Sequence, residues 1–426
     1  MLRLLHLADV HLGARHADLG EAAAAQRERQ FAAFRAAVEL AIAEKVDVVL
    51  IAGDLFDSNT QPRRSVERVA EELKRLAAAR IRTVIIPGTH DCYDRSSIYR
   101  TYDLAAMAGV DPAEDLVTVL TPDRPSVHLV ACDAEVHATV FASKRAEHSP
   151  LRDLRVGAAA RAATAAEPEG ASAGSATGRA ASAASRKTAA AAGDDSAAWH
   201  IGLVHGSIAI PDRTDADEVV VTKEEIAATG LDYLALGHWH SAQHGRAGAT
   251  TYAYSGAPEP VAVNQDGAGN VLLVELDETG GKRAVRIEER RIGKTRFEKL
   301  DIDAATLASQ PELVRKLAAL ADPDLVLDVR ITGVRPDELD VDPVEVEEQL
   351  KGSFLRARVR DTSLPGLSEG PIPSADTIAG AFIRNVEARI AELEADPDGA
   401  AAADAAELRD VLRLGRLLLA GHEVTL

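Results

Sequence analysis

The sequence predicts an α/β fold of layered sheets flanked by helices, with a second, smaller α+β domain and C-terminal helices. In the first 110 residues, short β-branched apolar runs alternate with helical stretches, which is typical of right-handed βαβ units and a largely parallel sheet. A shorter alternation of strand and helix patterns begins at about residue 296. A chain of 426 residues is also longer than one compact core usually needs, so more than one domain is expected.

Apolar spacing places the elements of the N-terminal part. Buried strands are predicted at residues 2–8, 46–52 and 83–86, and helices at residues 21–44 and 62–79. A hairpin and further strands are expected to continue the same sheet, the last three of them antiparallel. These later strands are predicted at residues 127–130, 136–141, 200–204, 231–236, 252–254, 270–275 and 284–289.

Composition divides the chain into three parts. Residues 157–198 contain 20 alanines and no large apolar side chain, so this segment is expected to be a disordered insertion in a catalytic domain of residues 1–290. Residues 291–370 are expected to form the α+β domain. Residues 371–426 contain two predicted helices with an apolar surface that would suit intramolecular packing or docking of a partner.

Charge and cysteine content limit the function classes. The chain carries 48 Lys and Arg against 67 Asp and Glu, a formal net charge of −19, and a strongly acidic protein repels nucleic acid over most of its surface. This argues against a free-standing, non-specific DNA binder, but not against an enzyme whose metal ions supply local positive charge. With two cysteines and neither a signal peptide nor a membrane-spanning run, a cytoplasmic protein without membrane contact is expected.

Carboxylates and imidazoles follow directly after five of the predicted strands. The carboxyl ends of parallel strands meet at one edge of a sheet, where ligands bind in open α/β folds. We therefore expect the five segments to converge. They are Asp9-Val10-His11, Gly53-Asp54-Leu55-Phe56-Asp57, Gly88-Thr89-His90-Asp91, His205-Gly206 and Gly237-His238-Trp239-His240.

Together these side chains offer oxygen and imidazole ligands and no thiolate. That set suits Mn²⁺, Fe²⁺ or Zn²⁺ at a hydrolytic site, whereas Ca²⁺ prefers oxygen alone and structural zinc usually takes cysteine. Asp54, on a tight glycine turn, suits a position between two ions that clamp a phosphodiester. Each segment alone is more simply a surface turn or a satisfied core pair, but five in this order indicate a shared metal site.

Written as DxH, GDxxD, G(N/T)HD, HG and GHxH, the five segments resemble the signature of the calcineurin-like metallophosphoesterases. Within them, residues 5–13, 52–57 and 237–240 are similar to the SbcD-type DNA repair exonucleases, which are nuclease subunits that work with an SMC-like ATPase in double-strand-break processing. The resemblance covers about residues 1–290. The region after it is similar in placement and size to that family's capping domain.

The resemblance implies two divalent metal ions, with Mn²⁺ as the expected ion and Mg²⁺, Fe²⁺ or Zn²⁺ as alternatives. One ion would be held by Asp9, His11, Asp54 and His240, and the other by Asp54, Thr89, His205 and His238. The family usually has Asn at the position of Thr89, and a hydroxyl is a poorer and shorter ligand. Either Thr89 coordinates through its hydroxyl or a water takes its place, and the second ion would be held more weakly.

Neighbouring residues are assigned other roles. By the same resemblance, His90 is the catalytic residue that steadies the phosphate or protonates the leaving oxygen, and Asp91 is predicted to orient it. Arg95 and Tyr93 are candidates for contact with a nucleic-acid phosphate or base, with an exposed loop as the equal alternative. Asp57 is expected to brace the turn before it. Surface or structural roles are the default for the remaining histidines, namely His6, His16, His128, His137, His148, His200 and His244.

The leading prediction is a two-metal-dependent phosphodiesterase, a DNA exonuclease or endonuclease of double-strand-break repair. The resemblance implies DNA and an SMC-like coiled-coil ATPase subunit as partners and allows a homodimer, whose groove would supply the DNA affinity that the acidic surface lacks. A phosphatase or cyclic-nucleotide phosphodiesterase of the same fold is the first alternative. A non-catalytic repair adaptor with an attenuated metal site is the second, and Thr89 is its only support.

Overall fold

The computed structural model describes residues 1–146, 148–157, 197–214, 219–262, 265, 267–336, 339–365, 372–395, 402–419 and 421. The insertion predicted at residues 157–198 lies almost wholly outside the described residues. The chain divides into two compact units, Met1–Thr295 and Arg296–Leu426. Within the described ranges, no helix is both long enough and apolar enough to cross a membrane.

The first sheet of the N-terminal unit has four parallel strands on one side and an antiparallel hairpin on the other. Its strands are β1 (Leu2–Leu7), β2 (Val48–Ala52), β3 (Arg82–Ile86), β4 (Val117–Val119), β13 (Asn270–Thr279) and β14 (Lys282–Arg291). They lie in the order β14-β13-β1-β2-β3-β4, and β13 pairs with β1 in antiparallel register. Helices α1 (Ala23–Ala43) and α2 (Arg63–Ala78) connect the first three strands, as the predicted βαβ alternation requires.

The later strands build a second sheet instead of continuing the first, which corrects the expectation of one sheet. They are β5 (Ser126–Leu129), β6 (Ala134–Ala138), β7 (Trp199–His205), β10 (Tyr233–Gly237), β11 (Gln243–Ala247) and β12 (Thr250–Tyr254). Their order is β11-β12-β10-β7-β6-β5. The sequence had led us to expect β12 in an antiparallel sheet with β13. Instead, β12 runs parallel to β10 and does not join β13. Two layers bury an apolar face of each sheet at once, which one extended sheet cannot do.

Shorter elements complete this unit. Helix α6 (Lys223–Ala228) begins with a capping box, in which the side chains of Thr222 and Glu225 each accept a hydrogen bond from the other's backbone amide. The other short elements are η1 (Ala17–Ala22), α3 (Ile98–Thr101), α4 (Leu104–Met107), η2 (Pro112–Glu114), η3 (Val130–Cys132), β8 (Ser207–Ile208) and β9 (Val220–Val221), where η marks a 3₁₀ turn.

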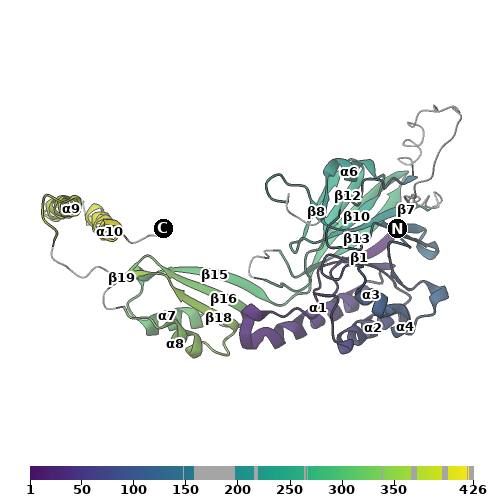
Figure 1. The fold of residues 1–426 in the computed structure, drawn as a ribbon, viewed down its shortest axis with the longest axis horizontal. Coiled ribbons are helices and arrows are strands. Elements are labelled where there is room, and N and C mark those ends of the chain that lie inside the picture. The colour runs from purple at the N-terminus through teal and green to yellow at the C-terminus, as the bar shows by residue number, and fades with distance from the viewer. Residues whose placement is uncertain are drawn as a thin grey trace, which may run out of the picture. The chain divides into compact units, whose positions relative to one another are not determined.

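The two sheets pack face to face around a common core. Leu50 and Val84 of the first sheet lie in one buried cluster with Ile201 of the second. The other face of the first sheet is covered by α1 and α2, through residues such as Phe34 and Leu73; Figure 1 shows α2 and α4 beside the first sheet and α6 beside the second. Each large apolar side chain buried in this way contributes about 1.5–3 kcal/mol, so the sheets form a rigid support for the loops at their edges.

The C-terminal unit contains a parallel three-stranded sheet. Its elements are β15 (Arg296–Asp303), η4 (Ala304–Thr306), α7 (Gln310–Ala318), β16 (Asp322–Thr332), β17 (Val334–Arg335), α8 (Pro343–Gln349), β18 (Phe354–Asp361) and β19 (Leu364–Pro365). The sheet order is β15-β16-β18. Leu313 and Leu317 of α7 share a buried cluster with Leu327 and Val329 of β16, so this unit has a core of its own.

Two helices end the chain, as the sequence predicts. They are α9 (Ile378–Glu394) and α10 (Ala402–Leu419). Thr377 caps α9 by accepting a hydrogen bond from the Gly380 amide, and Arg416 of α10 pairs with Glu387 of α9 at 2.7 Å. Ile378 and Leu418 remain exposed.

Candidate metal centre

The site is assembled where the loops after β1 and β2 run side by side beyond the ends of the strands. The backbone amide of Asp9 donates to the Gly53 carbonyl at 3.1 Å, and that of His11 donates to the Asp54 carbonyl at 3.0 Å. These bonds continue the pairing of β1 with β2 past the sheet. The side chains that follow the two strands are therefore held next to one another.

Four of the predicted ligands occupy backbone conformations that non-glycine residues rarely adopt. The φ angles are 54° at Asp9, 49° at His11, 51° at Asp54 and 101° at His238. Each such conformation costs roughly 1–3 kcal/mol and persists only where surrounding contacts enforce it, most often at a functional site. These four positions lie together at one edge of the two sheets, which marks that edge as the candidate site, although other non-glycine residues such as Lys45 and Asp133 also have positive φ angles.

Close contact between the sheets brings the histidines of the second sheet to this edge. A Cβ atom on Gly237, the last residue of β10, would lie 2.0 Å from the Ala52 carbonyl oxygen of β2, so only glycine allows this approach. The amide of His238 then donates to both carboxylate oxygens of Asp9, at 3.0 Å each. The loops after β1 and β10 are joined through that carboxylate.

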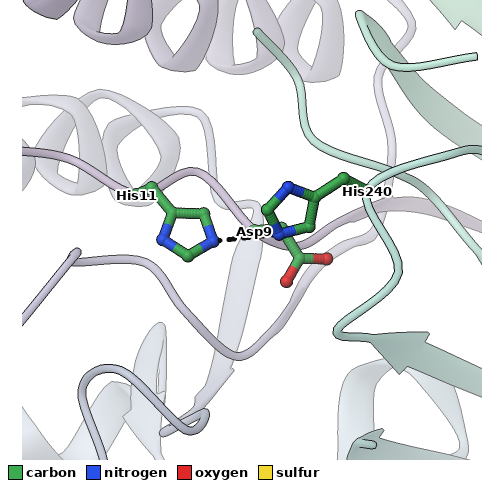
Figure 2. Close-up of side chains that lie close together, drawn as sticks. All are labelled: Asp9, His11 and His240. Atoms are coloured by element: carbon green, nitrogen blue, oxygen red, sulfur yellow. Dashed lines mark hydrogen bonds between the residues drawn. The ribbon is translucent and has the colours of Figure 1, made fainter. Parts of the chain in front are cut away.

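Asp9, His11 and His240 form a first group, with ligand atoms that all lie within 4.8 Å of one another. The Nε2 atoms of His11 and His240 are 3.2 Å apart, and Figure 2 shows the three side chains directed toward the same space. The side-chain amide of Gln265 contacts Nδ1 of His240. It fixes the orientation of that ring.

Asp9, Asp54 and His205 form a second group of the same size. The Oδ2 atom of Asp54 lies 3.2 Å from Nε2 of His205 and 3.8 Å from Nε2 of His11, so one carboxylate oxygen faces imidazoles of both groups. Nδ1 of His205 donates to the Ala52 carbonyl at 2.9 Å, while its buried Nε2 has no hydrogen-bond partner among the described residues. An imidazole held in this way presents Nε2 as a metal ligand.

Burial and mutual charge shift the pKa values of these groups. Burial raises the pKa of Asp9 to about 6, with Asp54 adding to the effect and His205 opposing it. Burial alone would lower the pKa of His205, but the carboxylates of Asp54 and Asp9 outweigh it and raise that pKa to about 10. Without a metal ion, His205 therefore carries the positive charge that the buried carboxylates require. Burial and the neighbouring His11 lower the pKa of His240 to about 3, which keeps that ring in the neutral form that binds metals.

His90 lies at the open side of the two groups. Its side chain is 47% exposed, its Nδ1 is 3.0 Å from the Asp57 carbonyl oxygen, and its ring packs edge-on against His11 with centroids 4.7 Å apart. Its backbone amide donates to Oδ1 of Asp54 at 2.8 Å. His90 is thus close to the ligand groups while its ring remains accessible to a substrate.

Asp91 has a different role from the predicted one. Its side chain accepts hydrogen bonds from the Gly88 amide at 2.7 Å, the Phe56 amide at 3.1 Å and the Tyr99 hydroxyl at 2.6 Å. These bonds tie the loop after β3 to the loop after β2. Asp91 is therefore directed into the core, and the contact made by the His90 ring is with Asp57 instead.

The other predicted residues lie around the two groups. The Thr89 hydroxyl is 3.5 Å from Oδ2 of Asp54, and the His238 ring packs edge-on against His205 with centroids 5.4 Å apart. Arg95 is exposed, and the Tyr93 ring is covered by a guanidinium group 4.1 Å from its centroid. Contact of Arg95 and Tyr93 with nucleic acid stays a prediction.

Two side chains near the site have no sequence motif. Gln265 contacts His240, and Lys144 lines a small pocket together with Thr89 and His205. Lys144 places a cation beside the second group, where a phosphate would be attracted. Both residues lie in connections without apolar periodicity, so no pattern in the sequence could have pointed to them.

The donors present fit a pair of divalent cations. The Asp9 carboxylate belongs to both groups, Oδ2 of Asp54 faces imidazoles of both, and Nδ1 of His205 and of His240 contacts Ala52 and Gln265 respectively. Buried carboxylates and imidazoles at such distances are stable when a cation neutralises them. The clusters can therefore hold divalent metal ions.

Known proteins with similar sequences agree with this chemistry. Residues 2–124 match the family model described as calcineurin-like phosphoesterase. Over 91 residues the chain is 43% identical to the DNA double-strand break repair protein Mre11 of Aeropyrum pernix, and over 128 residues it is 31% identical to Mre11 of Saccharolobus solfataricus. These matches cover 21% and 30% of this chain and 21% and 31% of the two relatives, so the chain spans less than a third of the length of either.

A longer match links most of the chain to one component of a nuclease. Over 339 residues it is 26% identical to the SbcD subunit of the nuclease SbcCD from Rhodobacter capsulatus, which covers 76% of this chain and 77% of that protein. The family match at residues 2–124 includes β1–β4 and the first three of the five segments. The chain therefore carries a calcineurin-like metallophosphoesterase domain and has homologues named Mre11 and SbcD.

Proposed function

We propose that the protein is a two-metal phosphodiesterase that cleaves DNA, an exonuclease or endonuclease of double-strand-break repair. One observation carries the proposal: Oδ2 of Asp54 faces Nε2 of His205 at 3.2 Å and Nε2 of His11 at 3.8 Å. This is the position of a carboxylate shared by two cations. The names of the relatives, the repair protein Mre11 and the SbcD subunit of a nuclease, support DNA as the phosphodiester.

The proposed ligand sets extend the two groups by Asp54 for the first ion and by Thr89 and His238 for the second, as the resemblance implies. Asp9, His11, Asp54 and His240 would hold the first ion, and Asp54, Thr89, His205 and His238 the second. Two such ions orient a water, lower its pKa and stabilise the attacking and leaving oxygens of a phosphodiester. Mn²⁺ is the proposed ion.

The protein's own side chains hold this arrangement in place. Oδ1 of Asp54 accepts the His90 amide at 2.8 Å, which leaves Oδ2 for the ions. Nδ1 of His11 faces Oδ1 of Asp57 at 3.4 Å, so Nε2 of His11 is the nitrogen available as a ligand. The ligands are therefore oriented before substrate binds.

His90 is the proposed proton donor. Its Nδ1 is held at the Asp57 carbonyl, so its Nε2 is the nitrogen that can reach a phosphate. We infer that the ring acts in its doubly protonated form: Nδ1–H donates to the Asp57 carbonyl, while Nε2–H steadies the phosphate and gives its proton to the oxygen that leaves when the P–O bond breaks, which leaves the ring neutral. Lys144, which lines the pocket beside Thr89 and His205, is a candidate for a second phosphate contact.

The net charge of −19 requires a source of DNA affinity outside most of the surface. We propose that an SMC-like coiled-coil ATPase subunit and a homodimer groove supply this DNA affinity. The proposed location of the complex is the cytoplasm. In this proposal residues 291–370 restrict access to the ions as a capping domain. The helices α9 and α10 dock the ATPase, through side chains such as Ile378 and Leu418, which are exposed.

The test is hydrolysis of linear DNA by the purified full chain with Mn²⁺. We expect shortening of an end-labelled duplex, abolished by a chelator and restored by added Mn²⁺. The same preparation is assayed on a small phosphodiester, bis-p-nitrophenyl phosphate. Cleavage of the small diester without any loss of DNA would contradict the nuclease and favour a phosphatase or cyclic-nucleotide phosphodiesterase.

A further inference from the structure

A second cluster of imidazoles and a carboxylate lies in the body of the second sheet, away from the strand ends. Glu135 and His137 of β6 and His200 of β7 have ligand atoms that all lie within 4.8 Å of one another. Nε2 of His137 is 3.2 Å from Nδ1 of His200 and 3.9 Å from Oε2 of Glu135. The three residues are 3%, 4% and 7% exposed in sequence order. Surface or structural roles were the default expectation for both histidines, which have no partner pattern in the sequence.

Strand register explains why these side chains meet. Glu135 and His137 are two residues apart on one strand, so they share a face of the sheet. In the parallel pairing of β6 with β7, Glu135 lies opposite His200, and His137 lies opposite Gly202. The His137 ring therefore lies on the same face as the side chains of Glu135 and His200.

A fourth candidate ligand lies on the neighbouring strand. His128 of β5 is directly opposite Glu135 in the antiparallel pairing of β5 with β6, and opposite residues point to the same face. Nδ1 of His128 is buried and has no hydrogen-bond partner among the residues that the structure describes. The three strands β5, β6 and β7 thus place His128, Glu135 and His200 in one row across the sheet, with His137 beside them.

The geometry suits a tetrahedral metal ion. Two ligand atoms at 2.0–2.2 Å from such an ion are about 3.3–3.6 Å apart, and the contacts at His137, 3.2 and 3.9 Å, lie on either side of that value. Burial, and then the neighbouring His200, lower the pKa of His137 to about 4, so the ring is neutral at pH 7, which is the form that binds metals. A hydrogen bond between the two rings would account for one nitrogen of each, but it leaves the buried nitrogen of His128 unexplained.

We propose that Glu135, His137 and His200 bind a structural Zn²⁺ ion, and that His128, whose nitrogens lie outside this group of ligand atoms, completes the site by a rotation of its side chain. Imidazole and carboxylate without thiolate suit Zn²⁺, and with the half-buried His128 turned in as a fourth protein ligand the site has no open position for catalysis. The ion joins β6 to β7, and the connection between these strands, residues 139–198, contains the alanine-rich segment. A link that closes a long connection restricts the unfolded chain and so stabilises the folded one. The proposal is independent of the nuclease activity.

The test measures zinc content. The full-length protein and His200→Gln are purified from zinc-supplemented cultures, passed through gel filtration and analysed by plasma mass spectrometry. Wild type should retain one more equivalent of zinc than His200→Gln, because any zinc at the strand-end groups is present in both. His244→Gln, which alters an exposed histidine of β11, is the matched control and should keep the wild-type content.

A crystallographic measurement covers the case in which His200→Gln fails to fold. Anomalous diffraction from wild-type crystals, recorded on both sides of the zinc absorption edge, should show a peak within about 2.5 Å of Nε2 of His137 and Nδ1 of His200. The proposal is overturned if that peak is missing, or if folded His200→Gln retains as much zinc as wild type.

Discussion

The two imidazole–carboxylate clusters of the N-terminal unit are built on different kinds of backbone. At the strand ends, Asp9, His11 and Asp54 all lie at positive φ, in loops held together by bonds between β1 and β2. In the second sheet, Glu135 and His200 lie in regular strand register. Backbone strain that is held in place by surrounding contacts indicates side chains with a functional role. Side chains on regular strands more often have a structural role.

Histidine pKa values show the same contrast. His205 and His137 are both buried, yet the pKa of His205 is raised to about 10 and that of His137 is lowered to about 4. The difference comes from the carboxylates of Asp54 and Asp9, which face His205, with Asp54 at 3.2 Å. The nearer neighbour of His137 is a second imidazole at 3.2 Å, and the Glu135 carboxylate is farther away, at 3.9 Å. The charge of a buried histidine therefore depends on the charged groups buried next to it, and not on burial alone.

The largest expected effect separates the two clusters. Asp54→Ala removes the carboxylate that both ions would share, and since metal ions supply several kcal/mol of transition-state stabilisation, turnover on DNA should fall about 10³-fold or more. His200→Gln should leave turnover within about twofold and lower the melting temperature instead. Turnover is measured with Mn²⁺ on the duplex, and melting is followed by circular dichroism.

The opposite pattern would break this comparison. If Asp54→Ala keeps wild-type turnover, the strand-end cluster is not the catalytic site. If His200→Gln abolishes turnover in a folded protein, the second cluster is more than structural. His244→Gln serves as the control, since its side chain is exposed on β11.

A second prediction separates proton transfer from metal binding within the strand-end site. His90→Gln should lower turnover about 100-fold, because a positioned acid or base contributes about that much, while the content of bound Mn²⁺ stays at the wild-type value. Metal content is measured by plasma mass spectrometry on the same samples. Loss of Mn²⁺ from His90→Gln would make this residue a ligand and would contradict the proposed role.

The third prediction uses a buried histidine that has no carboxylate beside it. Nδ1 of His6 is 2.9 Å from the Tyr233 hydroxyl, and burial lowers the pKa of His6 to about 3. Below the ordinary pKa of about 6.5, the unfolded chain binds a proton that the folded chain does not, so the free energy of unfolding falls as the pH falls. Between pH 6.5 and pH 5 this amounts to about 2 kcal/mol, at about 1.4 kcal/mol per pH unit.

Denaturant unfolding at the two pH values measures this dependence. Both tryptophans, Trp199 and Trp239, lie in the N-terminal unit, so their fluorescence reports that unit. In His6→Leu the drop between pH 6.5 and pH 5 should be smaller by about 2 kcal/mol. An equal drop in both proteins would mean that His6 titrates in the folded state.

The strand ends of the first sheet could be predicted because two independent signals coincide there. Apolar runs locate β1, β2 and β3, and a carboxylate or histidine follows each run within a few residues. The second sheet could not be separated from the first by sequence. A continuous apolar run indicates that a strand is buried on both faces, but it does not indicate which strands lie beside it. That distinction depends on packing between Val84 and Ile201, residues far apart in the sequence.

Contacts between side chains were harder to predict than their positions. The contact of His90 with Asp57 could not be predicted, because Asp57 follows β2 and His90 follows β3, whereas Asp91 is the carboxylate next to His90 in the sequence. His137 and His200 are separated by 63 positions, and the alternation of Glu135 with His137 on one strand is the only local sign of their cluster. Such partners become visible only when strand register is known.

The smallest expected effect concerns Thr89. Its hydroxyl is 3.5 Å from Oδ2 of Asp54, and a hydroxyl is a weaker and shorter ligand than an amide oxygen. Thr89→Asn should therefore tighten the binding of the second Mn²⁺ by about tenfold, the scale on which single substitutions around a metal ligand act. Isothermal titration with Mn²⁺ measures both binding steps, and the first step should be unchanged. Thr89→Val removes the hydroxyl at similar volume and serves as the control. If Thr89→Val and Thr89→Asn both bind the second ion with wild-type affinity, position 89 is not part of the metal site. A water or another residue then completes the coordination of the second ion.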